Sequence, residues 1–331
     1  MRITTNMIRR NYMSGLSAAL QESANTRNTV LSGRKYTRFS EDPFSASSAA
    51  NLERKYLRNK DYMDTVKELQ SIIDTQEDAV AELSDIAETV SKNYSVSAMN
   101  DVGGQDGRKS YATAIRELQE SMLNSLNAQY GDRFVLAGNS ALEAPFQLNA
   151  NGELIYRGVN VETGDPDELN RLASESTYAD IGYGMSIDDD GNISSSTVFD
   201  YALPGLSLVG YGTTADGTSK NMVLLLGEMA DVLEADTFDA QRYEKLWDQF
   251  QEGTEKLIDS SASLGIRSKS LETTATRLAD MDLTMTEQLD SLVNEDPAYA
   301  IMNYSYAEYA YNAALKVGTG IIGQSLLDFL N

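Results

Sequence analysis

The sequence of 331 residues contains neither cysteine nor histidine, and these absences remove most familiar kinds of chemistry. Without cysteine there is no disulfide and no thiol nucleophile, and without histidine there is no imidazole base. The zinc sites that proteins build from these two residues are excluded as well. We therefore expect no enzyme activity, no cofactor and no metal site.

Long apolar runs are also missing. The longest unbroken run covers Met222 to Leu226, whereas a membrane-spanning helix needs about 20 apolar residues. Residues 11–21, which follow Arg9 and Arg10, are interrupted by Asn, Ser and Gly and do not form the apolar core of a signal peptide. We expect no membrane insertion and, if the protein leaves the cell, export without a cleavable signal peptide.

Basic residues are scarce outside the first part of the chain. Residues 1–60 contain 11 Lys/Arg and 4 Asp/Glu, a net charge of +7, whereas the remaining residues contain 16 and 46, a net charge of −30. Because an acidic chain repels nucleic-acid phosphates, we expect no nucleic-acid binding. The basic segment is either a solvated surface or a surface that docks on acidic faces of this chain or of its neighbours.

The clearest positive signal is a helical seam in residues 297–331. Apolar and small residues recur there at alternating spacings of three and four, as in a coiled coil. Asp296 and Pro297 mark the start, since aspartate caps free amide groups and proline fits the first helical position. The seam consists of Ile301, Tyr304, Glu308, Tyr311, Leu315, Gly318, Ile322, Ser325 and Phe329. A seam of this length needs a partner helix.

Residues 1–33 predict a second helix with a thin apolar stripe, which forms fully only against a partner. The stripe consists of Tyr12, Leu16, Ala19, Ser23, Thr26, Val30 and Gly33. A connector follows, in which Gly33 ends this helix and Asp42-Pro43 opens the next. Because Glu-Asp-Pro precedes the next helix at both chain ends, at residues 41–43 and 295–297, we predict that the two terminal helices pair.

Four further helices are predicted between the ends. In the two longest, one residue line repeats every seventh position, from Leu52 to Tyr94 and from Leu264 to Leu292, as in coiled coils. A Gly-rich break at residues 100–107 joins the first of them to an antiparallel partner. The predicted helices cover residues 44–94, 109–129, 221–233 and 238–294.

Strand and turn signals replace helical periodicity from residue 130 to residue 219. Asn151-Gly152, between Phe146–Leu148 and Leu154–Tyr156, predicts a hairpin with a type I′ turn. We interpret this stretch as a small inserted β-rich domain.

One motif in the insertion resembles part of a calcium loop, because Asp188, Asp189 and Asp190 precede Gly191. In that register, however, the first ligand position is Ser186, and Thr197 stands where a bidentate glutamate is needed. A loop or hairpin turn is the simpler interpretation, with a weak cation site as the alternative.

Together these patterns predict a mainly α fold. Long antiparallel, coiled-coil-like helices come from both chain ends, with a small β-rich domain inserted between them. We expect terminal helical segments at 1–42 and 297–331, a helical bundle at 43–137 and 220–296, and a variable β-rich domain at 138–219.

Several short motifs, in this order, resemble the flagellin superfamily of bacterial axial proteins, and most closely the family of flagellar hook-associated protein 3, FlgL. The motifs are Met1–Thr4, Ser32–Lys35, Ser40–Pro43, Asp132–Gly138, Leu264–Arg267, Ala313–Lys316 and Ser325–Leu330. The resemblance implies a structural protein of the bacterial flagellum, exported through the flagellar type III apparatus with a chaperone on its C-terminal segment. It also implies an extracellular ring of subunits at the hook-filament junction, between hook-associated protein 1 and flagellin.

We expect the subunit contacts of such a ring on the terminal helices and the connector. The candidate residues are Leu16, Val30, Arg34, Lys35, Tyr304, Ala307, Tyr311, Ala314, Leu315, Gly318, Ile322, Phe329 and Leu330. An ordinary intramolecular core is the alternative for these residues. For the function, the alternatives are a filament flagellin and, more remotely, a secreted coiled-coil effector or an enzyme that uses Asp188 and Asp190.

Overall fold

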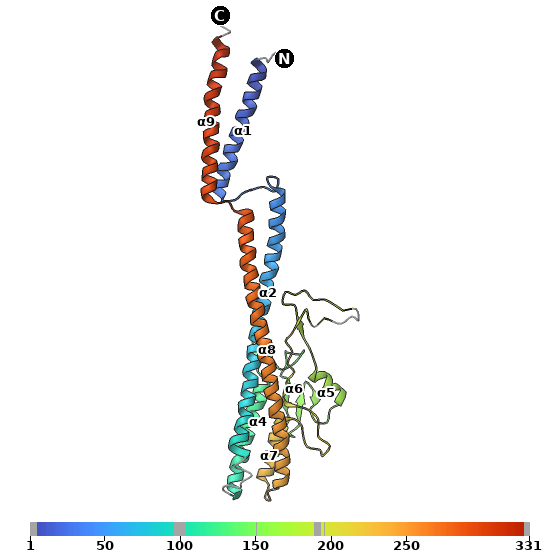
Figure 1. Cartoon of the computed structure of the whole chain (residues 1–331). Coiled ribbons are helices and arrows are strands. Elements are labelled where there is room, and N and C mark those ends of the chain that lie inside the picture. Colours follow the sequence, from blue (N-terminus) through green and yellow to red (C-terminus); the bar gives the residue numbers. More distant parts are fainter. Residues whose placement is uncertain (1–4, 96–103, 150, 189–192, 195, 328–331) are drawn as a thin grey trace. The chain divides into compact units, whose positions relative to one another are not determined.

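The computed structural model describes residues 5–95, 104–149, 151–188, 193–194 and 196–327. Its helices are α1 (Thr5–Ser32), α2 (Pro43–Thr89), the π-helix η1 (Val90–Ser95), α4 (Gly104–Leu126), α5 (Pro166–Ala173), α6 (Gly205–Val209), α7 (Met222–Glu234), α8 (Ala240–Val293) and α9 (Pro297–Leu327). Long helices from both chain ends dominate the structure (Figure 1), so the predicted mainly α fold is confirmed.

The chain forms two compact units. The terminal unit comprises residues 1–60 and 279–331, and the central unit comprises residues 61–278. Both α2 and α8 contribute residues to both units.

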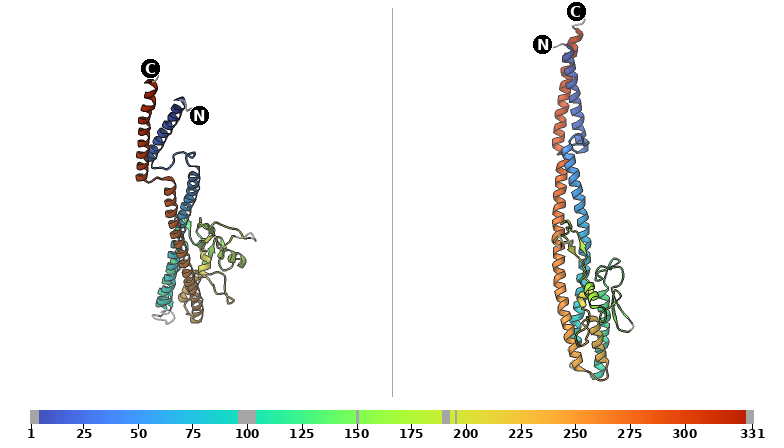
Figure 2. Two further views of the ribbon diagram at one scale, coloured as in Figure 1. Left: turned by 45° about the horizontal axis from the view of Figure 1, so that its top comes forward. Right: turned by 90° about the vertical axis from the view of Figure 1, so that its right-hand side faces the viewer.

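The core of the central unit lies among α2, α4, α7 and α8. In Figure 2, α4 and α7 pack side by side. Within the central unit the residue lines predicted for the long helices are buried, at Val66, Ile73, Val80 and Ala87 on α2 and at Leu264, Leu271 and Leu278 on α8. In the terminal unit Leu52, Met285 and Leu292 of these lines are half-buried, and Tyr299, the next residue on the second line, is 52% exposed. The apolar run Met222–Leu226 is buried too and begins α7, which is capped by the side chain of Asn221.

The inserted region contains short antiparallel strands. They are β1 (Gln129–Tyr130), β2 (Arg133–Phe134), β3 (Phe146–Leu148), β4 (Leu154–Tyr156), β5 (Val159–Asn160), β6 (Tyr178–Ala179) and β7 (Phe199–Asp200). β1 pairs with β2, β6 pairs with β7, and β3, β4 and β5 form one sheet in that order. Phe146 and Tyr156 face each other across β3 and β4 with ring centroids 4.8 Å apart, so this sheet contributes to the core.

The predicted hairpin is present, but its turn differs from the prediction. Asn149 N donates to Glu153 O, and Gly152 N donates to Asn149 O, both at 3.0 Å. This makes a three-residue loop, in which Gly152 has a positive φ of 80°. A type I′ turn connects its strands through a two-residue loop, so the type I′ prediction was wrong. Asn149 accounts for the longer loop, since its side chain accepts hydrogen bonds from Asn151 N and Glu153 N.

Two other local expectations also differ from the structure. The helix predicted from residue 109 already begins at Gly104, so Gly107 lies inside α4 instead of breaking the chain. Helices α5 and α6 occur within the stretch that we interpreted as strands and turns. α5 has its own start signal, since Asp165 caps it and Pro166 is its first residue.

In the described part of the chain, no helix offers a stretch both long and apolar enough to cross a lipid bilayer.

Candidate functional site

The candidate site is the pair of terminal helices, α1 and α9, which lie side by side (Figures 1 and 2). The stripe predicted for residues 1–33 is the partly buried face of α1. Its half-buried members are Tyr12, Leu16, Ala19, Ser23, Thr26 and Val30. The predicted pairing of the two chain ends is therefore present in the structure.

On α9 the inward face is made mostly of small residues and tyrosines. Ala300 and Ala307 are buried, with 4% and 8% of their surface exposed, and Gly318 is buried as well. Tyr304, Tyr311 and Ala314 are half-buried. Small side chains let the backbones of two helices approach closely, and here Tyr12 of α1 fills the space that they leave.

The contact of Tyr12 with α9 depends on glycine. Tyr12 Oη donates a hydrogen bond to Ala314 O at 3.1 Å. A Cβ atom on Gly318 would stand 1.9 Å from Tyr12 Oη and 2.3 Å from Tyr12 Cζ. Any side chain at residue 318 therefore displaces the tyrosine ring.

Buried apolar side chains in the terminal unit are small wherever the structure describes them. They are all alanines: Ala49, Ala300 and Ala307. Many of the large apolar side chains that are described lie on the outer faces of α1 and α9 instead. They include Ile8, Met13, Leu20, Tyr299, Ile301, Met302, Tyr306, Tyr309, Leu315 and Val317. Exposed apolar area of this kind is typical of protein contact surfaces.

The connector between α1 and α2 is fixed by backbone hydrogen bonds to residues near the end of α8. Gly33 ends α1 with a φ of 69°, which favours glycine. Lys35 N then donates to Val293 O at 2.8 Å, and Glu295 N donates to Gly33 O at 3.0 Å. These bonds hold both mirrored connectors together.

Each connector also carries its own acidic cap. The Glu41 carboxylate accepts hydrogen bonds from the backbone N–H groups of Thr37 and Arg38, at 2.7 and 3.2 Å, and these bonds lower the pKa of that carboxyl. Asp42 accepts from Ser45 N at 3.0 Å at the start of α2. Asp296 accepts from Ala298 N at 2.7 Å at the start of α9.

The predicted contact residues fall into three groups. Leu16, Val30, Tyr304, Ala307, Tyr311, Ala314 and Gly318 lie on the faces that α1 and α9 turn toward each other. Arg34, Lys35 and Leu315 are exposed. Ile322 lies in α9 but its side chain is outside the described part, and Phe329 and Leu330 lie outside the described residues.

Ala300 was missed, although Ala307 and Ala314 on the same line of α9 were predicted contact residues. The predicted seam runs through Ile301, which is 55% exposed, whereas its neighbour Ala300 is buried. The signal was present in the sequence, since Ala300, Ala307 and Ala314 recur every seventh position.

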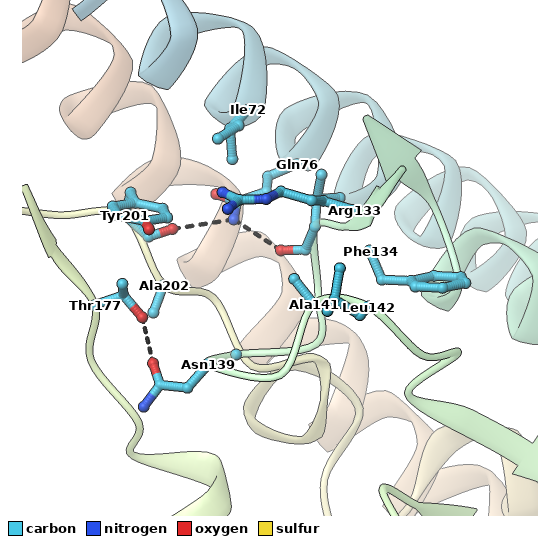
Figure 3. A pocket seen from close by; sticks show the side chains of 12 residues that line it. Ile72, Gln76, Arg133, Phe134, Asn139, Ala141, Leu142, Thr177, Tyr201 and Ala202 are labelled. Atoms are coloured by element: carbon cyan, nitrogen blue, oxygen red, sulfur yellow. Dashed lines mark hydrogen bonds between the residues drawn. The ribbon is translucent and has the colours of Figure 1, made fainter. Parts of the chain in front are cut away.

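A second site missed by sequence reasoning is a pocket of about 250 Å³ in the central unit (Figure 3). At its base Gln76 of α2 is 1% exposed. Its Nε2 donates to Val135 O at 2.9 Å and to Tyr201 O at 3.1 Å, while its Oε1 has no hydrogen-bond partner. Gln76 therefore ties Val135, which precedes the inserted region, and Tyr201, which lies within it, to α2. A polar residue within the apolar seam of α2 was the available signal.

The calcium-loop motif has no structural support from the residues described. Asp189, Asp190 and Gly191 lie outside the described residues, and within the rest of the chain no group of three or more acidic side chains could hold a metal ion. The flanking residues form a hairpin, in which Ser194 N donates to Ser186 O at 2.9 Å.

Comparisons with known proteins agree with this architecture. Residues 3–141 match the model of the bacterial flagellin N-terminal helical region. Flagellar hook-associated protein 3 of Salmonella typhimurium is 23% identical over 337 residues, which cover 98% of each chain.

Along nearly its whole length, the chain is similar to flagellar hook-associated protein 3.

Two solved structures have a similar fold. Hook-associated protein 3 of Legionella pneumophila matches with a TM-score of 0.56 at 11% identity, over 73% of this chain and 98% of that one. FlgL of Bacillus cereus matches with a TM-score of 0.52 at 14% identity, over 72% and 99%. The names of the sequence relatives indicate the bacterial flagellum.

Proposed function

We propose that the protein forms a ring of subunits at the hook-filament junction, between hook-associated protein 1 and the first flagellin subunits. It reaches this extracellular site through flagellar type III export, with a chaperone on its C-terminal segment. The observation that carries the proposal is the inversion of the terminal unit, in which alanines are buried and large apolar side chains are exposed. Such a unit gains its apolar burial from neighbouring subunits.

A truncation that ends at Ala298 tests the role of α9. Because α9 packs on α1 and the large apolar core lies in the central unit, the truncated monomer should keep nearly all of its thermal stability. Filaments should no longer attach to hooks, and flagellin should be found in the medium. Loss of cooperative unfolding in the truncated monomer would count against the proposal.

A single substitution separates subunit contact from folding more sharply. Tyr309 is 75% exposed on α9, so Tyr309→Asp should leave the melting temperature of the monomer unchanged. It should nevertheless reduce attached filaments, because it places a charge in an apolar contact. Ser261→Asp, at an exposed position of α8 in the central unit, is the matched control. Equal assembly by both variants would show that this face of α9 is not a contact.

A filament flagellin is the second candidate, since the matched family model describes flagellin itself. Immunogold labelling of intact flagella separates the two. A junction protein should be labelled at the hook end only and be a minor component of sheared filaments. Label along the whole filament would refute the junction assignment.

A further inference from the structure

The connector between α1 and α2, together with the helix ends on either side of it, exposes large apolar side chains. Leu31, Phe39 and Phe44 are 77%, 61% and 81% exposed. Basic side chains, Arg34, Lys35 and Arg38, accompany them in the same short segment. We call these six residues the connector patch. Its chemistry fits a partner surface that is both acidic and apolar.

Among the described residues, the side chains of Arg34 and Arg38 form no salt bridge, although the charge of Arg38 helps to lower the pKa of the nearby Glu41 carboxyl. Lys35 Nζ donates to the carbonyl oxygen of Ser291 at 2.5 Å instead of to a carboxylate. The ion pairs found among the described residues lie in the central unit, such as Arg157 with Glu175 at 2.5 Å.

The terminal unit contains a surface of the opposite kind. Residues 279–296 hold six acidic residues and no basic one. On α8 the carboxylates of Asp280, Glu287 and Asp290 are exposed, and Leu283 among them is 60% exposed. We call residues 279–296 the acidic segment.

The distribution of charge along the chain supports an interaction between the connector patch and the acidic segment. The chain has 27 Lys/Arg and 50 Asp/Glu. The terminal unit holds 12 Lys/Arg and 12 Asp/Glu, and the central unit holds 15 Lys/Arg and 38 Asp/Glu. The whole net charge of −23 thus lies on the central unit. Within the terminal unit, residues 1–60 carry +7 and residues 279–331, with 1 Lys/Arg and 8 Asp/Glu, carry −7. Equal and opposite charges on two segments suit copies that meet segment to segment.

The two surfaces also lie at the same level of the terminal unit. The bond of Lys35 N to Val293 O places the connector beside the end of the acidic segment. A copy displaced sideways, without a shift along the helices, therefore brings its connector patch to the acidic segment of its neighbour. Because the two surfaces differ, the contact is heterologous, and a heterologous contact repeated by rotation closes a ring.

We propose that the connector patch of one copy docks on the acidic segment of the next copy in the ring. This inference rests on the proposed function and names the surfaces of one of its contacts. Leu31, Phe39 and Phe44 bury against the region of Leu283, while the arginines meet the carboxylates and fix the register.

Cysteine cross-linking tests the contact between different copies, because the natural chain has no cysteine. Two tagged chains, Ser40→Cys and Thr286→Cys, are expressed together in cells that lack the natural copy, and isolated flagella are oxidised. Both positions are exposed, one beside Phe39 and the other within the acidic segment. We expect a disulfide-linked heterodimer when both chains are present. Neither chain alone should form a dimer.

Ser261→Cys, in the central unit of the same helix, replaces Thr286→Cys as the control and should give at least tenfold less heterodimer. Equal yields from the two pairs, or dimers of Ser40→Cys chains alone, would overturn the proposal.

Charge reversal tests the chemistry. Arg34→Glu with Arg38→Glu, and Glu287→Lys with Asp290→Lys, should each reduce attached filaments at least tenfold, and the combination of all four should restore most of them. Lys67→Glu with Lys256→Glu in the central unit is the control for net charge. If the connector reversal stops assembly, but the four changes together do not restore it, the connector binds a different flagellar protein and the proposal fails.

The outcome is separable from that of the proposed function. Heterodimers from a chain that immunogold finds along the filament would leave the contact intact and reject the junction. Label at the hook end without heterodimers would support the junction and reject the contact.

Discussion

Gln76→Glu is the sharpest test of how the inserted region is held on the helices. The substitution keeps the size and shape of the side chain but removes the two N–H donors. Gln76 Nε2 donates to Val135 O, just before the insertion, and to Tyr201 O within it (Figure 3). Since Gln76 is 1% exposed, a carboxylate in its place would be buried beside two carbonyl oxygens. We expect the glutamate to be protonated in the folded protein.

The cost follows from two contributions. A protonated carboxyl can donate to only one of the two carbonyls, and leaving the other without a partner costs about 1–3 kcal/mol. Keeping the proton at pH 7 on a group whose unfolded pKa is about 4.3 costs a further ~3.7 kcal/mol. The pKa is raised by folding, so this second loss is small near pH 4 and grows as the pH rises toward the folded pKa. We expect destabilisation by about 6 kcal/mol at pH 7 and about 2 kcal/mol near pH 4.

Hydrogen exchange of the amides near Val135 and Tyr201, together with urea unfolding at both pH values, measures the effect. Gln241→Glu is the matched control, because Gln241 is exposed in the first turn of α8 and its change should be nearly neutral. Destabilisation no larger than that of the control would refute the clamp. Equal destabilisation at pH 4 and pH 7 would refute the protonated glutamate.

Three further changes test other parts of the central unit. Gly210→Ala should destabilise by about 2–4 kcal/mol in urea unfolding, because Gly210 has a φ of 83° and an added Cβ would stand 2.3 Å from Lys220 O. Arg116→Gln should reduce the free energy of unfolding by about 1 kcal/mol or less, because the half-exposed ion pair of Arg116 with Glu234 is screened by solvent. The hydrogen bond from Arg116 lowers the pKa of Glu234. The loss of stability should therefore be seen at pH 7 and vanish as the pH falls through that lowered pKa. Burial and neighbouring carboxylates raise the pKa of Glu77, so Glu77→Gln should raise the melting temperature slightly at pH 7 and not at pH 4.

The long helices could be predicted because their buried apolar residues recur at every seventh position of the sequence. Val66, Ile73 and Val80 stand seven apart and are all buried, so the sequence itself displays the contact face. The turn after β3 could not be read in the same way, because Asn149 competes for the backbone amides of Asn151 and Glu153. Short side chains that bond to nearby backbone alter turn type without altering the hydrophobic pattern.

The candidate site was predictable in outline and shifted in detail. The α1 stripe from Tyr12 to Val30 faces α9, as periodicity predicted. On α9 the predicted seam was placed on large residues such as Ile301, whereas the buried residue is its neighbour Ala300. Periodicity identifies apolar residues on one face of a helix, but it does not show which face packs on the partner helix. When the large side chains of a helix contact another subunit, the face that packs within the chain is the one with small residues. Size, in addition to spacing, then distinguishes the two faces.

The two units thus divide the requirements of folding and of assembly between them. The central unit encloses large apolar side chains such as Tyr243, Phe250 and Leu271 and carries the whole net charge. We therefore expect it to fold without the terminal unit. In the terminal unit, burial of a few alanines returns little free energy, whereas ordering each residue costs about 1–2 kcal/mol. On the proposed function, neighbouring copies restore the balance when they cover the outer faces of α1 and α9. A unit that has little stability alone and gains stability from its neighbours makes assembly cooperative, because each added copy stabilises the surface on which the next copy binds.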